Sequence, residues 1–171
     1  MRTFVQIDVQ NLFFSAKDLN KRLNFKKIRD HFYEKKEDKV VGLNAYIIRT
    51  PDANSEKFEE KLISFDYKLS IKQAQVISDD EGNRVYSNTN QDIAICIDCM
   101  LNVNNFDKWV LMSGDGDFID LCKYLKKKDK FIEVWSFPGV CFNKRFCDYA
   151  DQIIFMSDKF LYNESYRKKG N

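Results

Sequence analysis

The strongest constraint on the fold is a short apolar run that leads directly into two closely spaced aspartates. Residues 109–112 are all apolar, and Asp115 and Asp117 follow soon after them. A run of this length beside glycines predicts a buried strand, and Gly116 gives the backbone room for a tight turn. Ligands bind at the carboxyl ends of the strands in open α/β sheets. The two carboxylates therefore mark this edge of the predicted sheet as a candidate site.

The same pair of carboxylates points to a divalent cation. Acids packed this closely repel each other, so their crowding costs stability unless a cation or a proton relieves it. A hard divalent metal prefers oxygen ligands and keeps water molecules in its coordination shell. The pattern thus predicts a metal-dependent enzyme.

Other catalytic and metal-binding patterns find little support. His31 is the only histidine, which argues against a histidine-based catalytic triad. Cys96 and Cys99 form a single C-x-x-C pair, whereas a structural zinc site needs a second pair of ligands. The sequence also contains no Walker motif and no dinucleotide-binding fingerprint.

The length and composition indicate one soluble domain. The chain has 171 residues, of which 44% are hydrophobic and 32% are charged, as is typical of a globular protein with one core. We expect a single domain over residues 1–160 and a polar tail over residues 161–171. No uncharged stretch approaches the roughly 18 residues of a membrane span. Five cysteines without the pattern of a disulfide framework favour a reducing, cytoplasmic setting.

The net charge of +2 conceals an uneven distribution of basic residues. Four groups can be distinguished: Lys17, Lys21, Arg22, Lys26, Lys27 and Arg29; Lys126, Lys127, Lys128 and Lys130; Lys144 and Arg145; and Arg167, Lys168 and Lys169. Such groups could hold phosphate backbones around an acidic centre. They could equally be solvated helix faces, and the sequence leaves both interpretations open.

Apolar periodicity predicts strands that alternate with helices. Strands are expected over residues 3–8, 40–48, 109–112, 131–137 and 153–155, helices over 11–14, 25–33, 58–65, 118–125 and 142–149, and a hairpin over 75–86. Residues 91–98 are ambiguous, because isoleucines two positions apart suit a strand while Ala94 and Ile97 also suit one face of a helix. Alternating strands and helices imply an α/β fold with a mainly parallel, doubly wound sheet.

The chain resembles the NYN domains, a branch of the PIN-like nucleases. The resemblance rests on the run Asp8-Val9-Gln10-Asn11 after a strand, Asp92 with Asp98, the run Ser113-Gly114-Asp115-Gly116-Asp117-Phe118, and Ala150-Asp151, all in the family's order. It spans roughly residues 3–157. One departure is that Asn90-Gln91 stands where many relatives carry a lysine.

This resemblance implies a PIN-like sheet of strand order 3-2-1-4-5, flanked by helices, with residues 92–102 forming a helix. The first and fourth strands would be neighbours, so Asp8 and Asp115 would converge at one crevice. An Asp92 at the start of a helix would gain from the positive end of the helix dipole and keep its charge.

The resemblance also implies roles for the site residues. Asp8, Asp92, Asp115 and Asp117 would form the catalytic cluster and hold Mg²⁺ or Mn²⁺, with Asp8 and Asp115 as principal ligands. Asn11 and Ser113 would orient these ligands through hydrogen bonds, and Lys144 and Arg145 would grip the substrate phosphate. Asp117 could instead cap the following helix, while Asp98 and Asp151 are interpreted as structural.

The function expected on these grounds is a metal-dependent ribonuclease that hydrolyses phosphodiester bonds of single-stranded or structured RNA. One alternative is a catalytically silent RNA-binding or regulatory module that keeps the acidic pocket. Another is a magnesium-dependent phosphatase of small phosphoesters, since aspartates and Mg²⁺ also serve that chemistry. A homodimer would lengthen the basic surface around a single shallow cleft.

Overall fold

The computed structural model describes residues 1–51, 55–87, 89–139 and 142–162. Its elements are β1 (Arg2–Asp8), α1 (Val9–Asp18), α2 (Phe25–Glu34), β2 (Lys39–Arg49), α3 (Glu56–Ser64), β3 (Lys68–Gln73), β4 (Gln75–Ser78), β5 (Arg84–Ser87), α4 (Asp92–Leu101), β6 (Lys108–Met112), η1 (Gly116–Phe118), α5 (Ile119–Lys126), β7 (Phe131–Ser136), η2 (Lys144–Asp148), β8 (Gln152–Phe155) and η3 (Asp158–Phe160), where η marks a 3₁₀ turn.

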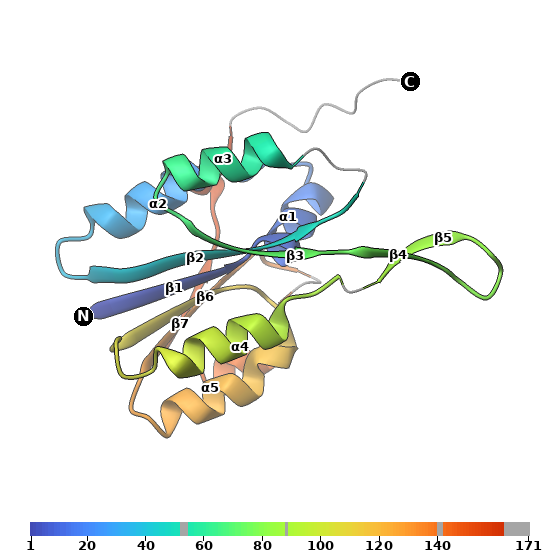
Figure 1. Ribbon diagram of the computed structural model, residues 1–171. Helices are drawn as coiled ribbons and strands as arrows, with labels where there is room; N and C mark the ends of the chain where they lie inside the picture. The colour runs from blue at the N-terminus through green and yellow to red at the C-terminus, as the bar shows by residue number, and fades with distance from the viewer. Residues whose placement is uncertain (52–54, 88, 140–141, 163–171) are drawn as a thin grey trace.

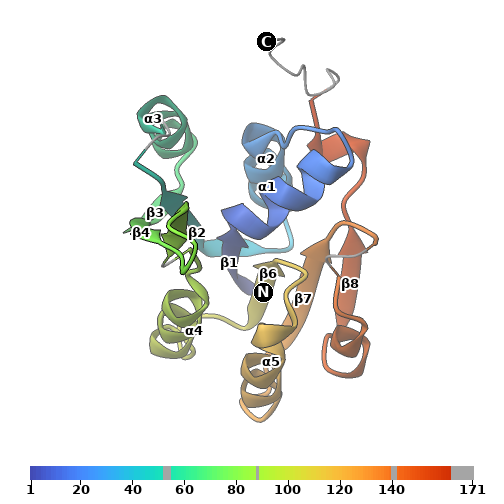
Figure 2. The same cartoon turned by 90° about the vertical axis from the view of Figure 1, so that its right-hand side faces the viewer.

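Six parallel strands form the central sheet in the order β3-β2-β1-β6-β7-β8. Helices α1, α2 and α3 cover one face, and α4 and α5 cover the other (Figures 1 and 2). The doubly wound α/β fold is thus confirmed. The predicted order 3-2-1-4-5 needs correction, because β4 and β5 form a separate hairpin before β6 and β8 adds an edge strand beside β7.

The two faces of the sheet are both buried, which explains the nearly continuous apolar runs of its central strands. Val5 and Ile7 of β1 pack toward α1 and α2 in one core cluster. Phe4 and the β6 residue Trp109 belong to the cluster beneath α4 and α5. Alternate side chains of a strand point to opposite faces, so β1 anchors both layers.

Three local predictions need correction. Strand β3 (Lys68–Gln73) was not predicted, since this edge strand is only half-buried and its lysines hide the alternation. The helix expected over residues 142–149 is instead the short 3₁₀ turn η2. Helix α1 begins directly after β1, so Asp8 rather than Asn11 occupies its N-cap.

Residues 91–98, which the sequence left ambiguous, belong to helix α4. Ile95 is fully buried, whereas Ile93 and Ile97 are exposed, so their spacing of two reflects a helix with apolar residues on more than one face. The predicted hairpin is present as β4 and β5, and it projects beyond the sheet (Figure 1). Among the described residues, no helix is long and apolar enough to cross a membrane.

The first two residues of the predicted polar tail contact the folded domain. Leu161 is buried and bridges to Leu23, and the backbone N–H of Tyr162 donates to the carbonyl of Arg22 at 2.9 Å. Residues 163–171 lie outside the described residues. The folded part therefore includes Leu161 and Tyr162.

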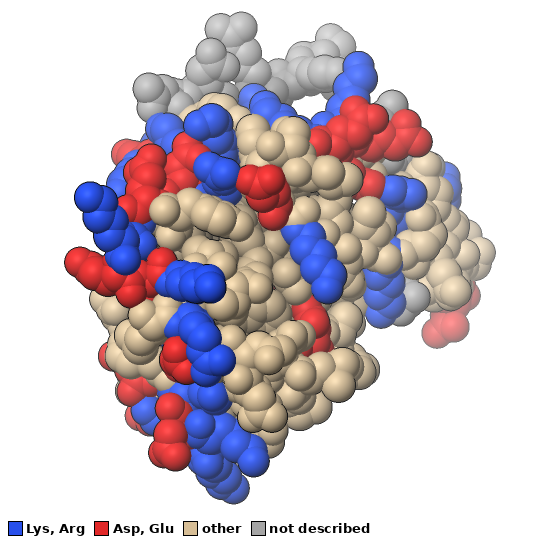
Figure 3. Space-filling view, turned by 60° about the vertical axis from the view of Figure 1, so that its left-hand side comes forward, with Lys and Arg blue, Asp and Glu red and all other residues tan. Residues whose placement is uncertain are grey.

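Part of the basic surface is paired with acids. Lys26 of α2 contacts Asp30 at 2.6 Å, and Lys126 of α5 contacts Asp151 at 2.6 Å. On the face shown in Figure 3, positive and negative side chains lie side by side. At these residues the sequence's basic groups are solvated, ion-paired helix faces rather than free phosphate-binding patches.

The single histidine lies in an aromatic cluster. The ring of His31 lies 5.1 Å from that of Trp135 and 5.2 Å from that of Phe160, measured between centroids. Its Nε2 is buried and has no hydrogen-bond partner among the described residues. Burial lowers the pKa of His31 to about 4, and the charges of Lys35 and Lys159 add to this effect.

Charged groups from other elements also act on this histidine. Lys108 of β6 lowers the pKa of His31, whereas Glu133 of β7 raises it. The Nζ of Lys159 lies 3.4 Å from the histidine Nδ1. The imidazole is therefore held neutral by a mainly apolar pocket with several cations near it.

We predict that His31 makes the fold acid-sensitive. Its folded-state pKa lies below the ordinary value of 6.5, so its contribution to stability is complete above pH 6.5 and is lost as the pH falls toward 4. Urea unfolding at about pH 7.5 and about pH 4.5 should show a loss about 1–2 kcal/mol larger in the wild type than in His31→Phe. Equal losses in both proteins would contradict this account.

Candidate functional site

Three carboxylates meet at the carboxyl edge of the sheet. Oxygen atoms of Asp92, Asp115 and Asp117 all lie within 4.8 Å of one another. Asp115 follows β6, Asp117 lies in η1, and Asp92 is the first residue of α4. Asp8 is outside this group of three, but the hydroxyl of Ser113 contacts both the Asp8 carboxylate and the backbone N–H of Asp115. We call these four residues the acidic cluster.

Asp8 is fixed by neutral donors from two parts of the chain. Its Oδ1 accepts a hydrogen bond from the backbone N–H of Asn11 at 3.1 Å, and its Oδ2 accepts one from the Ser113 hydroxyl at 3.2 Å. The Asn11 side chain in turn accepts from the N–H of Gly114 at 3.0 Å, and Ser113 Oγ accepts from that of Asp115 at 3.2 Å. These contacts join the β1–α1 corner to the β6–η1 loop. Asn11 and Ser113 are the two residues for which the sequence predicts an orienting role, and that role stays a prediction.

Two carboxyl groups of the cluster, those of Asp8 and Asp92, have raised pKa values. Burial raises the pKa of Asp8 to about 6, while the hydrogen bonds from Asn11 and Ser113 oppose the shift. Burial also raises the pKa of Asp92, and the charges of Asp115 and Asp117 raise it further. Lys72 acts in the opposite direction and lowers the pKa of Asp92, and the predicted contribution of the helix dipole at Asp92 stays a prediction.

The donor set fits a hard divalent cation. Within the part of the chain that the structure describes, no residue of the acidic cluster forms an ion pair with lysine or arginine. A divalent cation bound by several carboxylate oxygens would relieve both the repulsion and the cost of burial. The fit rests on two observations: the oxygen donors lie close together, and no described lysine or arginine forms an ion pair with them.

Gln91 holds the start of α4 against the sheet. Its Nε2 donates to the carbonyl oxygens of Ile47 at 2.6 Å and Ser70 at 2.8 Å, and its Oε1 accepts from the Ser70 hydroxyl at 3.0 Å. These three bonds fasten the residue before Asp92 to β2 and β3. The departure at Asn90-Gln91 therefore has a positioning role that the sequence did not suggest.

A second buried glutamine, Gln6 of β1, holds the same helix against the sheet. The side chain of Gln6 donates to the carbonyl of Ile95 at 3.1 Å and accepts from the indole N–H of Trp109 at 2.8 Å. Its amide also contacts the hydroxyl of Tyr46. Because these groups are buried, each unpaired partner would carry a desolvation cost. The network links α4 to the three central strands β2, β1 and β6.

The remaining acids of the predicted motifs have structural partners. Asp98 accepts hydrogen bonds from the side chains of Asn44 at 2.7 Å and Tyr46. Asp151 accepts from the backbone N–H of Ile132 at 2.8 Å, besides its pair with a lysine. The prediction that both are structural agrees with these contacts. The alternative that Asp117 caps the following helix is wrong, because the N-cap residue of α5 is Phe118 and no side chain caps it.

Lys144 and Arg145 lie beside the acidic loop. Both are exposed in η2, and the preceding Asn143 donates its backbone N–H to the carbonyl of Gly114 at 2.9 Å. A Cβ at Gly116 would lie 2.0 Å from the side-chain nitrogen Nδ2 of Asn143, so a glycine is needed for this close packing. The structure thus places η2 against the loop but shows no direct contact of either cation with a carboxylate.

One cation near the cluster was missed by the sequence analysis. The charge of Lys72 on β3 lowers the pKa of Asp92, and its Nζ donates to the carbonyl of Asn90 at 2.9 Å. No local pattern pointed to this lysine, because β3 itself was not predicted. Its contact with Asn90 brings it beside the residues that lead into Asp92.

Comparisons with known proteins agree with this architecture. The "Low amplitude and bright protein LabA" of Synechococcus elongatus is 29% identical over 140 residues, which cover 81% of this chain and 75% of the relative. A crystal structure of a Vibrio parahaemolyticus protein of unknown function aligns with a TM-score of 0.78 over 94% of this chain and 96% of that one, at 23% identity, and supports the fold alone. The NYN domain matches residues 2–158. The chain therefore belongs to the NYN domain family of the PIN-like nuclease superfamily.

Proposed function

We propose that this protein is a metal-dependent ribonuclease that hydrolyses RNA phosphodiester bonds at the acidic cluster. The observation that carries the proposal is the set of Asp92, Asp115 and Asp117, whose oxygens lie within 4.8 Å of one another without a paired lysine or arginine among the described residues. Membership of the NYN family supports a nuclease at the level of the family. Fold likeness alone would not carry it.

The acidic cluster would hold Mg²⁺ or Mn²⁺. Asp92, Asp115 and Asp117 supply the clustered oxygens, and Asp8 adds a fourth carboxylate held by Asn11. The bound ion would lower the pKa of a water molecule and neutralise charge on the phosphate. Ser113 and Asn11 keep Asp8 oriented at the β6–η1 loop, so these two residues position ligands rather than contact substrate.

Cations around the cluster would receive the phosphate backbone. We assign this role to Lys144 and Arg145 from η2 and to Lys72 from β3, on either side of the acidic loop. Lysine and arginine donate charge-assisted hydrogen bonds to phosphate oxygens. A cytoplasmic location and a homodimer stay predictions from the sequence.

We predict that Asp115→Asn abolishes cleavage of a labelled mixed-sequence RNA in Mn²⁺ or Mg²⁺ while leaving RNA affinity nearly unchanged. The substitution keeps the shape of the side chain but removes an anionic ligand. Cleavage should fall at least about 100-fold, as is common when charge stabilisation is lost. The double variant Asp8→Asn/Asp115→Asn should behave in the same way. Asp120→Asn is a matched control, because Asp120 is exposed and lies outside the cluster.

Three other results would redirect the proposal. Cleavage that persists in EDTA would remove the metal from the mechanism. RNA binding without cleavage in either metal would favour the silent RNA-binding module. Faster turnover of a chromogenic phosphomonoester than of any oligonucleotide would favour a phosphatase.

We further predict that Lys72→Met raises the KM for RNA about tenfold, equivalent to about 1.4 kcal/mol, with a smaller effect on kcat. Its charge would contact substrate phosphate before and during the reaction, so mainly binding should weaken. Lys68→Met is the matched control, since Lys68 is exposed at the start of the same strand, four residues before Lys72. A fall in kcat alone would assign Lys72 to the positioning of Asp92 instead.

A further inference from the structure

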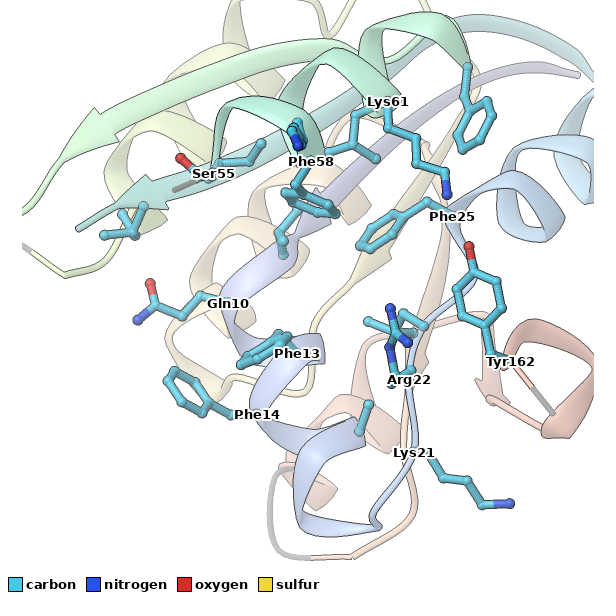
Figure 4. Close-up of a pocket in the computed structure, with 18 of the residues that line it drawn as sticks. Gln10, Phe13, Phe14, Lys21, Arg22, Phe25, Ser55, Phe58, Lys61 and Tyr162 are labelled. Carbon is cyan, nitrogen blue, oxygen red and sulfur yellow. The ribbon is translucent and has the colours of Figure 1, made fainter. Parts of the chain in front are cut away.

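A large cleft opens on the opposite face of the sheet from α4 and α5. It has a volume of about 590 Å³ and lies between α1, α3 and the end of β2 (Figure 4). This volume falls within the usual range of ligand sites, about 300–1,000 Å³. The roles proposed above for the acidic cluster do not use it.

Aromatic rings form much of the cleft wall. Phe13 and Phe14 of α1 are 42% and 47% exposed, and their ring centroids lie 5.5 Å apart in an edge-to-face arrangement. Across the cleft, Phe58 of α3 packs edge-to-face on Phe25 of α2, with centroids 5.4 Å apart. In Figure 4 the rings of Phe13 and Phe58 come from facing helices. Exposing two large rings to water on the surface of α1 is unfavourable, and a ligand that covers them would remove this cost.

Cations stand around these rings. Lys57 and Lys61 of α3 line the cleft, and neither forms an ion pair among the described residues. At the other end, the guanidinium of Arg22 lies 5.4 Å from the ring centroid of Tyr162. Lys21 also lines the cleft and contacts Asp158 at 3.2 Å. No described residue of the lining is acidic, so the cleft favours an anionic ligand.

The cleft and the acidic cluster share the same edge of the sheet. Val9 and Gln10, which line the cleft, directly follow Asp8. Ile48 of the lining lies two residues beyond Tyr46, which pairs in register with Asp8. The Oε1 of Gln10 is buried and has no hydrogen-bond partner among the described residues. A chain bound in the cleft could therefore continue over the end of β1 to the cluster.

We propose that this cleft binds a single-stranded segment of the RNA substrate, next to the nucleotides at the acidic cluster. Bases would stack on Phe13 and Phe14, and phosphates would contact Lys57, Lys61 and Arg22. This inference deepens the proposed function and rests on it for the choice of substrate. Stacking platforms combined with a basic groove are the means by which proteins hold single strands without reading sequence. An amphipathic peptide would use the rings but would have to be acidic throughout to match the cations.

The test measures RNA affinity separately from cleavage. Fluorescence anisotropy of a labelled single-stranded RNA of about 12 nucleotides, recorded in EDTA, compares the wild type with Phe13→Ala/Phe14→Ala and with Lys57→Glu/Lys61→Glu. Each double variant should weaken binding at least about tenfold. Only the charge variant should also flatten the salt dependence of the affinity. Because all four side chains are exposed, both variants should fold, which circular dichroism will verify.

Matched controls carry the same changes elsewhere. Ile93→Ala/Leu101→Ala removes two apolar side chains that are 74% and 77% exposed on α4, and Lys127→Glu/Lys128→Glu reverses two exposed charges after α5. Both controls should bind RNA like the wild type. Equal weakening by the controls, or wild-type affinity in the cleft variants, would overturn the inference. Binding of an acidic amphipathic peptide that RNA cannot displace would also overturn it, in favour of a protein partner.

Cleavage assays separate this inference from the proposed function. Under Mn²⁺, the variant Phe13→Ala/Phe14→Ala should cut long RNA less well but should cut a dinucleotide, too short to reach the cleft, as the wild type does. If no protein cuts any RNA yet the cleft variants still lose affinity, the ribonuclease proposal fails and the RNA cleft stands. If the wild type cuts RNA and the cleft variants cut it equally well with unchanged affinity, the proposed RNA cleft fails and the ribonuclease proposal stands.

Discussion

The parallel pairing of β1 with β6 is the constraint on which the rest of the site depends. Ile7 and Met112 are register partners, so both strands end at the same level. The chain leaves β1 toward α1 and leaves β6 toward η1 and α5, on opposite faces of the sheet. The residues that follow the two strands therefore meet at the carboxyl edge of the sheet. The hydrogen bond between Ser113 and Asp8, 105 residues apart, joins them there.

Holding four carboxylates together requires a scaffold that does not neutralise them. An arginine inside the cluster would remove the repulsion but would also occupy the oxygens that a metal needs. The protein uses neutral groups instead: a serine hydroxyl, backbone N–H groups and the amides of Gln6 and Gln91. These donors fix where the acids stand without supplying a counter-charge. The pKa of Asp8 is raised as a result, because these neutral donors only partly offset the effect of burial.

Much of the fold and the identity of the cluster could be predicted from the sequence. Strand β6, which leads into Asp115, is buried on both faces, so the apolar pattern that predicts it is strong and local. Gln91 could not be assigned a role, because its partners Ile47 and Ser70 lie on strands that only the tertiary fold brings to it. Lys72 was missed for a related reason: an edge strand with lysines lacks the alternation that marks a half-buried strand.

The cleft was beyond sequence analysis for a different physical reason. Phe13 lies four residues after the buried Val9, so helical periodicity alone would place it in the core, yet it is 42% exposed and lines the cleft. In the folded protein, two kinds of chemistry lie on the two sides of β1. The acids act on the side of α4 and η1, and the rings and cations lie on the side of α1 and α3. An attractive surface for phosphates on one side can then deliver a polyanion to an acidic centre that would by itself repel it.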